Sequence, residues 1–239
     1  FIETNTYFIN ENSSLPVVSI SGDADLTQLL GGTTLEPTGY FEYFETDGSF
    51  IDETMGDFDK HGNDSWAYDQ RGIDFIARDD HGYKKRLEHK FFNTSERTNF
   101  RRLILKAAGS DNFPGQTGGA HMRDVFAQKL SELGHLELDE RKSTFISLFV
   151  NGQYWGIYDL REKVDDNQYT DYYYDQDYIF RDSDNYLQYI KTWGTTEPEF
   201  GNQPAITAWD SLMAYVQNND MSIDANYNYV ESQLNIDSL

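Results

Sequence analysis

Short runs of β-branched and aromatic residues, separated by turn residues, fill the first half of the chain and predict strands. The expected strands are 15–20, 40–44, 49–51, 72–77, 86–92 and 102–107. Asp47-Gly48 is a tight-turn signal that joins the second and third of them in a hairpin, and His81-Gly82 marks a turn before the fifth. A short helix is expected over 26–30, with Asp25 as its N-cap.

A loop rich in Gly and Asn follows over 109–119, and a helical period begins after it. The helix is expected over 121–133, and its apolar positions are Met122, Val125, Phe126, Leu130 and Leu133. Two further apolar runs, 144–150 and 153–160, flank Asn151-Gly152. This dipeptide is the strongest short hairpin signal, so the two runs are expected to pair.

The remainder of the chain is expected to be helical, most clearly over 205–216 and more weakly over 185–191 and 227–234. Strands followed by helices predict an α+β fold. The expected parts are a β-rich part over 1–108, a central helix and hairpin over 109–165, and a helical part over 166–239.

The chain is strongly acidic, with 41 Asp and Glu against 19 Lys and Arg in 239 residues, a formal charge of −22. Such a charge argues against binding to nucleic acid and against attachment to an anionic membrane. No apolar run approaches the roughly 20 residues that cross a bilayer, so membrane insertion is not expected. An aromatic content of 15% indicates a packed core rather than disorder.

The compartment and the integrity of the chain are also suggested by its sequence. It contains no Cys, which excludes disulfides and thiolate zinc sites. The acidic composition favours a secreted or cell-surface bacterial protein, and an acidic cytosolic protein is the alternative. The first residue is Phe1 and no signal peptide follows it, so the chain is expected to be a mature or excised piece of a longer product.

Common catalytic and metal-binding motifs do not occur. There is no G-x-S-x-G, no Walker loop and no G-x-G-x-x-G, and the five His lack metal-ligand spacing. The stretch 57–62 resembles the opening of a calcium loop, but Tyr68 occupies the position of the essential Glu, which rejects an EF-hand. Looser calcium binding there or at Asp182 and Asp184 is the alternative to a solvated acidic loop.

Two segments could carry a binding function. The loop 60–71 could expose backbone N–H groups to an anion beside Arg71, or it could be an ordinary Asx-type turn. In the hairpin 151–163, Gly156 permits a close approach to the strand, and aromatic residues precede a cluster of charges. This hairpin is either a core element or a ledge for a flat ring beside an ion pair.

Four stretches together resemble the CotH family, the spore coat protein H-like atypical kinases and their secreted bacterial relatives. They are L-P-V-V-S-I at 15–20, G-N-D-S at 62–65, A-G-S-D-N before H-M-R-D at 121–124, and N-G-Q-Y-W-G-I-Y-D-L-R-E-K-V-D at 151–165. The resemblance implies a divergent protein-kinase-like fold outside the cytosol. It also implies binding of ATP with Mg²⁺ or Mn²⁺ and phosphorylation of Ser or Thr in extracellular proteins.

The resemblance implies a set of nucleotide-binding residues, namely Gly62, Asn63, Ser65, Arg71, Arg123, Tyr158, Glu162 and Lys163. Arg71 stands near a position where the family has a lysine, so it is expected to bind phosphate as a planar fork. Tyr158 or a neighbouring aromatic is expected to stack on adenine, and Glu162 to form a structural ion pair. Asp111 and Arg123 match the Asp and Arg that flank the family's central helix.

Two segments of the family pattern, N-x-D-W-x-x-N-N and W-D-x-D, do not occur in this sequence. In the family they carry the catalytic and metal-binding Asp and Asn. The chain is therefore expected to be a partial domain that lacks the metal site and is inactive alone. No catalytic or metal-ligating residue is assigned.

Two other functions compete with the kinase interpretation. The first is a non-catalytic module that binds glycans or matrix, possibly with calcium, through Tyr172, Tyr173, Tyr174, Trp155 and Trp193. The second is a scaffold or exported cargo recognised by a secretion or cell-surface complex. The expected partner is thus an extracellular protein or a polysaccharide.

Overall fold

A computed structural model describes residues 5–9, 12–32, 35–80, 82–112, 117–177, 179, 187–192, 194–200 and 203–238. The chain divides into two compact units. One comprises Phe1–Gln128 and Arg141–Lys163, and the other comprises Lys129–Glu140 and Val164–Leu239. These units differ from the three expected parts, because the second hairpin completes the β-rich unit instead of lying in a separate central part.

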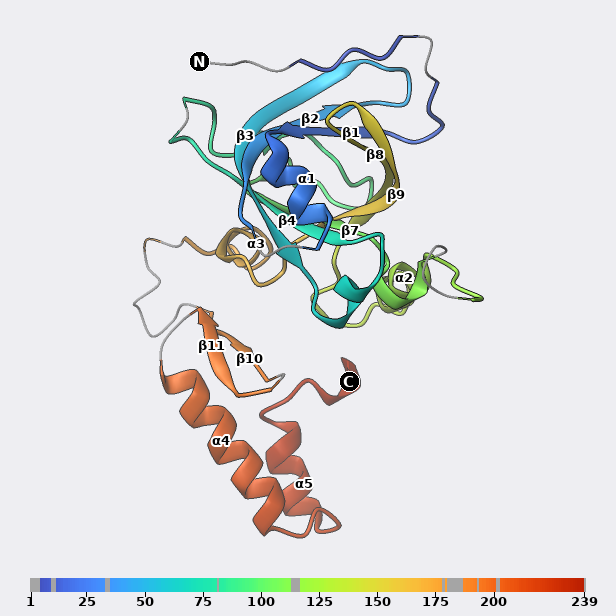
Figure 1. Cartoon of the computed structure of the whole chain (residues 1–239). Coiled ribbons are helices and arrows are strands. Elements are labelled where there is room, and N and C mark those ends of the chain that lie inside the picture. The colour runs from blue at the N-terminus through green and yellow to red at the C-terminus, as the bar shows by residue number, and fades with distance from the viewer. Residues whose placement is uncertain are drawn as a thin grey trace. The chain divides into compact units, whose positions relative to one another are not determined.

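Seven strands of the first unit close into a barrel in the order β1-β2-β3-β4-β7-β9-β8 (Figure 1). They are β1 (Val17–Gly22), β2 (Thr38–Phe44), β3 (Phe50–His61), β4 (Gly72–Ala77), β7 (Arg102–Lys106), β8 (Ser143–Val150) and β9 (Gln153–Glu162). Neighbours are antiparallel except β1 and β8, which pair in parallel from Val17 opposite Ser147 to Ile20 opposite Val150. Closure leaves no long unpaired sheet edge in the ring.

Helix α1 (Ala24–Leu30) contributes to the same core as the barrel strands. Its Leu26, Leu29 and Leu30 are buried in one cluster with apolar residues of β1 and β3. The N-cap of this helix is Asp23, two residues before the expected Asp25, because the carboxylate of Asp23 accepts the backbone N–H of Asp25. Asp25 therefore lies in the first turn and does not cap the helix.

Two glycines that face each other allow β2 and β3 to pack on the aromatic core. Gly39 pairs with Gly56, and a Cβ on Gly56 would lie 2.2 Å from the carbonyl oxygen of Ile76 on β4 and 2.8 Å from the ring of Phe75. On Gly39 a Cβ would lie 3.1 Å from the ring of Phe58. The core rings therefore occupy the space that side chains would need.

Most of the expected strands and turns are confirmed. Asn151 and Gly152 both have positive φ, 49° and 77°, as a tight primed turn requires. The expected strand over 86–92 is wrong for most of its length, since only β5 (Leu87–Glu88) forms there and pairs with β6 (Asn99–Phe100). Its aromatic residues are buried as part of a loop, so burial and not strand pairing explains the apolar run.

Of two further expectations, one fails and one is confirmed. Residues 57–61, expected as an acidic loop, are the end of β3, and Asp57 is paired with Arg78 at 2.6 Å. Helix α2 (Arg123–Leu133) forms where it was expected, but no residue of this helix is buried. The side chains of Phe126, Leu130 and Leu133 are 57%, 52% and 65% exposed.

The second unit is mainly helical. Its elements are α3 (Asn167–Tyr173), β10 (Tyr189–Lys191), β11 (Glu197–Phe200), α4 (Gln203–Asn218), α5 (Asp224–Glu231) and the 3₁₀ turn η4 (Ile236–Ser238). Tyr215 of α4 contacts Tyr229 of α5 at 4.3 Å between ring centroids and donates a hydrogen bond to Asn226. The prediction of a helix over 185–191 is wrong at 189–191, because these residues form β10. Residues 185 and 186 lie outside the described residues.

The observed content of helices and a barrel confirms a mixed α and β fold. Among the described residues, no helix combines the length and the apolar composition needed to cross a membrane.

The Gly39 and Gly56 pair yields a stability prediction. Replacing Gly56→Ala should lower the free energy of unfolding by about 3 kcal/mol, because the new Cβ overlaps backbone atoms of β4. Gly22→Ala is the control, since its Cβ would approach no atom closer than 3.3 Å. Urea unfolding measures both variants, and equal losses would show that the packing at Gly56 is looser than described.

Candidate functional site

The loop between β3 and β4 holds Arg71 against the backbone. The Arg71 guanidinium donates to the carbonyl oxygens of Leu30 at 2.8 Å, Trp66 at 3.0 Å and Asp69 at 3.3 Å. It thereby ties the end of α1 to the turn η1 (Asp64–Ala67). Its Nε and Nη1 donors thus have a structural role, and phosphate binding by Arg71 stays a prediction.

Three expected residues of the hairpin are held in the protein interior. The ring of Tyr158 is fully buried and its hydroxyl donates to the carbonyl of Arg71 at 2.9 Å, so it cannot stack on adenine. Burial also raises the pKa of this hydroxyl above its usual range. Glu162 is buried and pairs with Arg97 at 3.0 Å, which confirms its expected structural ion pair. Lys163 lies 3.2 Å from the Asp74 carboxylate.

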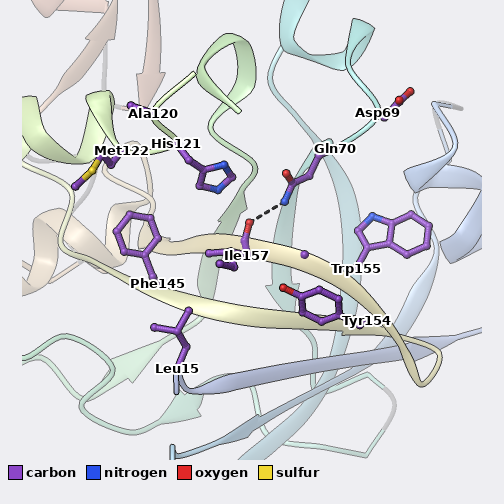
Figure 2. A pocket seen from close by; sticks show the side chains of 11 residues that line it. Leu15, Asp69, Gln70, Ala120, His121, Met122, Phe145, Tyr154, Trp155 and Ile157 are labelled. Atoms are coloured by element: carbon purple, nitrogen blue, oxygen red, sulfur yellow. Dashed lines mark hydrogen bonds between the residues drawn. The ribbon is translucent and has the colours of Figure 1, made fainter. Parts of the chain in front are cut away.

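The accessible side of the hairpin forms a pocket, which we call the aromatic pocket. It has a volume of about 620 Å³ and is lined by Leu15, Asp69, Gln70, Ala120, His121, Met122, Phe145, Tyr154, Trp155, Gly156 and Ile157 (Figure 2). The Gln70 side chain crosses above the strand and donates to the carbonyl of Ile157 at 2.7 Å. Gly156, with φ 131°, permits this approach, because a Cβ there would lie 2.9 Å from the Gln70 nitrogen.

The start of α2 is organised by Asp111, which lies twelve positions before Arg123. Its carboxylate accepts the backbone N–H groups of Ala120, Met122 and Arg123 at 2.9, 3.1 and 3.0 Å. These backbone hydrogen bonds hold the pKa of Asp111 below its usual range. The Arg123 guanidinium pairs with the same carboxylate at 2.9 Å, so the two matching residues meet as a pair.

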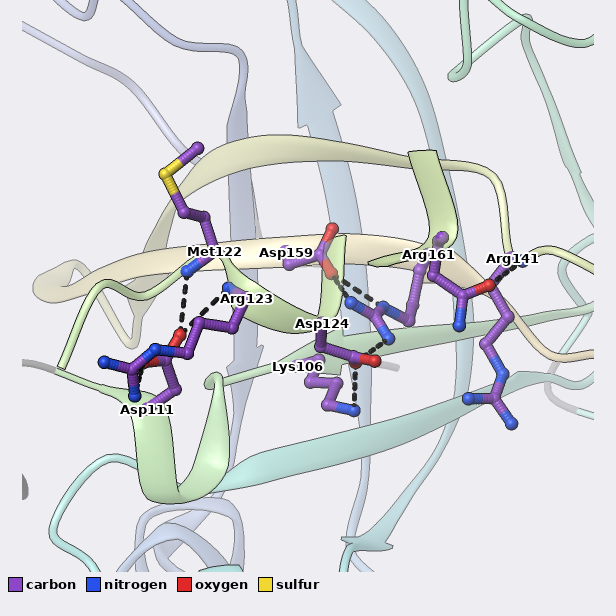
Figure 3. A network of polar contacts seen from close by, with 9 residues as sticks. Lys106, Asp111, Met122, Arg123, Asp124, Arg141, Asp159 and Arg161 are labelled. Carbon is purple, nitrogen blue, oxygen red and sulfur yellow. Dashed lines mark hydrogen bonds and ion pairs between the residues drawn. The ribbon is translucent and has the colours of Figure 1, made fainter. Parts of the chain in front are cut away.

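A second cluster of charges lies one residue further along the helix (Figure 3). The carboxylate of Asp124 lies 2.5 Å from the Lys106 ammonium of β7 and 2.5 Å from the Arg161 guanidinium of β9. Arg161 is buried and also binds Asp159. Burial alone would raise the pKa of Asp124, but the two cations outweigh it and hold that pKa well below its usual range. Burial lowers the pKa of Lys106.

Lys106 and Asp124 line another pocket, which we call the lysine pocket. Its volume is about 410 Å³ and its lining residues are His61, Gly62, Gly72, Lys106, Ala107, Ala108, Gly109, Ser110, Asp111, Arg123 and Asp124. Ala108 and Gly109 have positive φ values of 61° and 51°. Successive left-handed residues at a turn make a concave backbone surface of the kind that binds anions.

The lysine pocket brings cations together in an acidic chain. Lys106 and Arg123 line it, and each is paired with a carboxylate that also lines it, Asp124 and Asp111. Burial, followed by the charges of Lys163, Lys106, Arg141 and Arg161, lowers the pKa of His61 to about 3. Both causes disfavour the protonated imidazole, so His61 stays neutral at this wall of the pocket.

The structure brings together only part of the expected nucleotide site. Gly62 and Arg123 line the lysine pocket, whereas Arg71, Tyr158, Glu162 and Lys163 do not. Asn63 is exposed next to Gly62, and Ser65 lies in the following 3₁₀ turn. Sequence reasoning missed Lys106, Asp124 and His61. Lys106 could have been suspected as a binding residue, since it lies at the end of a predicted strand, just before a Gly-containing loop.

Metal ligands were not assigned from the sequence, and the described residues contain no group of three or more Asp, Glu or His that could hold a metal ion. A calcium site at 57–62 has no such group either, and Asp182 and Asp184 lie outside the described residues.

A family model described as CotH kinase protein matches residues 58–239, which is more than half of the chain. The chain belongs to the CotH family. The match covers α2, all residues of the lysine pocket and the β8–β9 hairpin, so the family prediction is confirmed. A comparison of this CotH chain with curated proteins gives no match.

The residues of the expected glycan platform belong to different units of the CotH chain. Tyr172, Tyr173 and Tyr174 belong to the second unit, Trp155 belongs to the first, and Trp193 lies outside the described residues. Tyr174 donates a hydrogen bond to Asp139 at 2.7 Å.

The depressed pKa of His61 predicts a pH dependence of stability. The folded chain keeps this imidazole neutral down to about pH 3, whereas the unfolded chain protonates it below its usual pKa. The unfolded state therefore binds more protons, and stability should fall as the pH drops from about 7 to about 5.

Replacing His61→Gln should flatten this dependence, which urea unfolding at the two pH values measures. His135→Asn is the control, because His135 is exposed with φ 53°, a conformation that Asn tolerates. If both variants lose the same stability on acidification, His61 is not held neutral by its burial and the cations around it.

Proposed function

We propose that this CotH chain is the nucleotide-binding part of an atypical kinase and that the phosphates of ATP occupy the lysine pocket. The carrying observation is that Lys106 and Arg123 line one pocket in a chain with a net charge of −22. An acidic protein binds a polyanion only where local cations overcome the overall field. Lys106 and Arg123 are the cations that line the pocket.

The pairing of Lys106 with Asp124 supports the same proposal. Protein kinases place a strand lysine against the nucleotide phosphates and hold it with a carboxylate from a helix. Here the lysine ends β7 and the carboxylate belongs to the first turn of α2. The second cation at Asp124, Arg161, keeps this carboxylate ionised and fixed when a phosphate competes for Lys106.

Each residue of the pocket would make its own contribution to phosphate binding. Lys106 supplies a point charge, and Arg123, whose side chain is 65% exposed, can reach an outer phosphate as a planar donor. Backbone N–H groups at 108–110 would face the anion from the turn. Bound ATP carries Mg²⁺ or Mn²⁺, which neutralises part of its charge and promotes phosphoryl transfer in kinases.

The wider function follows from family membership and composition. We propose that the intact protein is secreted or displayed on a bacterial cell surface and transfers phosphate to Ser or Thr of extracellular proteins. A divergent kinase-like fold fits this role. The absence of Cys and the acidic surface are consistent with that compartment, and the family match supports the kinase chemistry.

Calorimetric titration with Mg-ATP tests the nucleotide site. Lys106→Met should weaken binding by about ten- to hundredfold, the value of one charge-assisted hydrogen bond. Arg123→Gln should weaken it less, because this side chain is more exposed.

Lys84→Met is the matched control, since Lys84 pairs with Asp52 and does not line the lysine pocket. Circular dichroism confirms that each variant is folded. Equal affinities for the Lys106 and Lys84 variants, or an unmodified chain that binds no Mg-ATP, would contradict the proposal.

A further inference from the structure

The aromatic pocket does not stand alone on the β8–β9 hairpin. A neighbouring pocket, also of about 620 Å³, shares Leu15, Tyr154 and Ile157 with it. We call the second one the adjoining pocket; Phe8, Phe44 and Phe149 are among its lining residues. Because three residues form a common wall, the two pockets lie side by side and make one groove with two hollows.

The shared wall is accessible and its apolar surface is unusually exposed for a strand of a barrel. Tyr154 is 59% exposed and Ile157 is 43% exposed. Tyr154 continues a row of edge-to-face rings, with centroids 5.5 Å from Phe149, which in turn lies 5.0 Å from Phe8. Such contacts hold the rings in fixed orientations before any ligand arrives.

The charge of the groove restricts its ligand. Among the described residues that line the two pockets, none is Lys or Arg. Asp69 lies at the aromatic pocket, and Glu45 and Asp47 lie at the adjoining pocket. Hydrogen bonds from Ser49 hold the pKa of Asp47 below its usual range, so this end of the groove stays negative. Phosphates, acidic sugars and acidic peptides are therefore repelled.

The walls of the aromatic pocket also favour an apolar side chain over a neutral sugar ring. Leu15, Met122, Phe145 and Ile157 present apolar atoms, while the amide nitrogen of Gln70 is already engaged by the strand backbone. A sugar ring needs hydrogen-bond partners around its edge, and such a wall provides few. An apolar side chain loses no hydrogen bond when it enters.

We propose that the two pockets together bind a segment of a partner protein that presents two apolar side chains in succession and carries no acidic or phosphorylated residue between them. Each hollow receives one side chain, and Tyr154 and Ile157 contact both. The carboxylates at the two ends exclude acidic segments. The proposal goes beyond the nucleotide site and does not depend on it, because no residue that lines the two pockets also lines the lysine pocket.

Calorimetric titration of the full 239-residue chain tests this inference without nucleotide. The probe is the capped peptide acetyl-Phe-Ser-Leu-Ser-Phe-amide, and its matched control carries Asp in place of both Ser. We expect the neutral peptide to bind and the acidic one to bind at least about tenfold more weakly, because two added negative charges face the groove carboxylates.

Two variants test the position of the peptide. Tyr154→Ala should weaken binding of the neutral peptide about tenfold or more, since this ring forms the shared wall. Tyr172→Ala is the control, as its side chain is 46% exposed on α3 of the other unit. Both residues are exposed, so both variants should remain folded.

Several results would overturn the inference. They are no binding of the neutral peptide, equal binding of the acidic peptide, equal affinities of the two tyrosine variants, and binding of a linear β-linked glucose hexamer in place of the peptide. None of these results would affect Mg-ATP binding at Lys106, so failure here is distinguishable from failure of the nucleotide site.

Discussion

The carboxylate of Asp124 is the contact on which the arrangement of the functional region depends. It bridges Lys106 of β7 and Arg161 of β9, and it does so from the first turn of α2. One helix terminus is thereby fixed against two neighbouring strands of the barrel, while Asp111 holds the backbone of the same turn. These contacts place Lys106, Asp111 and Arg123 at the wall of one pocket in an acidic protein.

Local patterns of the sequence predicted the barrel strands better than the functional contacts. The hairpin at Asn151-Gly152 was predictable because its turn demands two residues of positive φ, and β7 was predictable from its apolar run. The closure of the ring by parallel pairing of β1 with β8 could not be read from the chain, since it joins segments more than a hundred residues apart. Helix α2 was predictable from its apolar period, although none of its residues is buried.

The difference between local patterns and contacts of distant segments also explains the corrections to the candidate site. Arg71 was expected to bind phosphate because it is a cation in a polar loop, yet three carbonyl oxygens close to it in space engage its Nε and Nη1 donors. Tyr158 was expected to stack on a base, yet its ring is buried in the core while Tyr154 lies outside. Strict alternation would place these two residues on one face, and the register shift opposite Leu148 and Phe149 separates them. The family resemblance matched Asp111 and Arg123 to its pattern, and only the fold revealed that they pair and that Lys106 joins them at one pocket.

Two pockets of different character thus lie on one barrel, the lysine pocket, where we propose that phosphate binds, and an apolar groove lined in part by acidic residues. Amide chemical shifts of isotope-labelled protein during titration with Mg-ATP test the first assignment most directly. The account predicts that the amide signals of Gly62, Gly109 and Ser110 shift with the nucleotide while that of Trp155 does not. Shifts confined to Tyr154, Trp155 and Ile157, with none around Lys106, would contradict it.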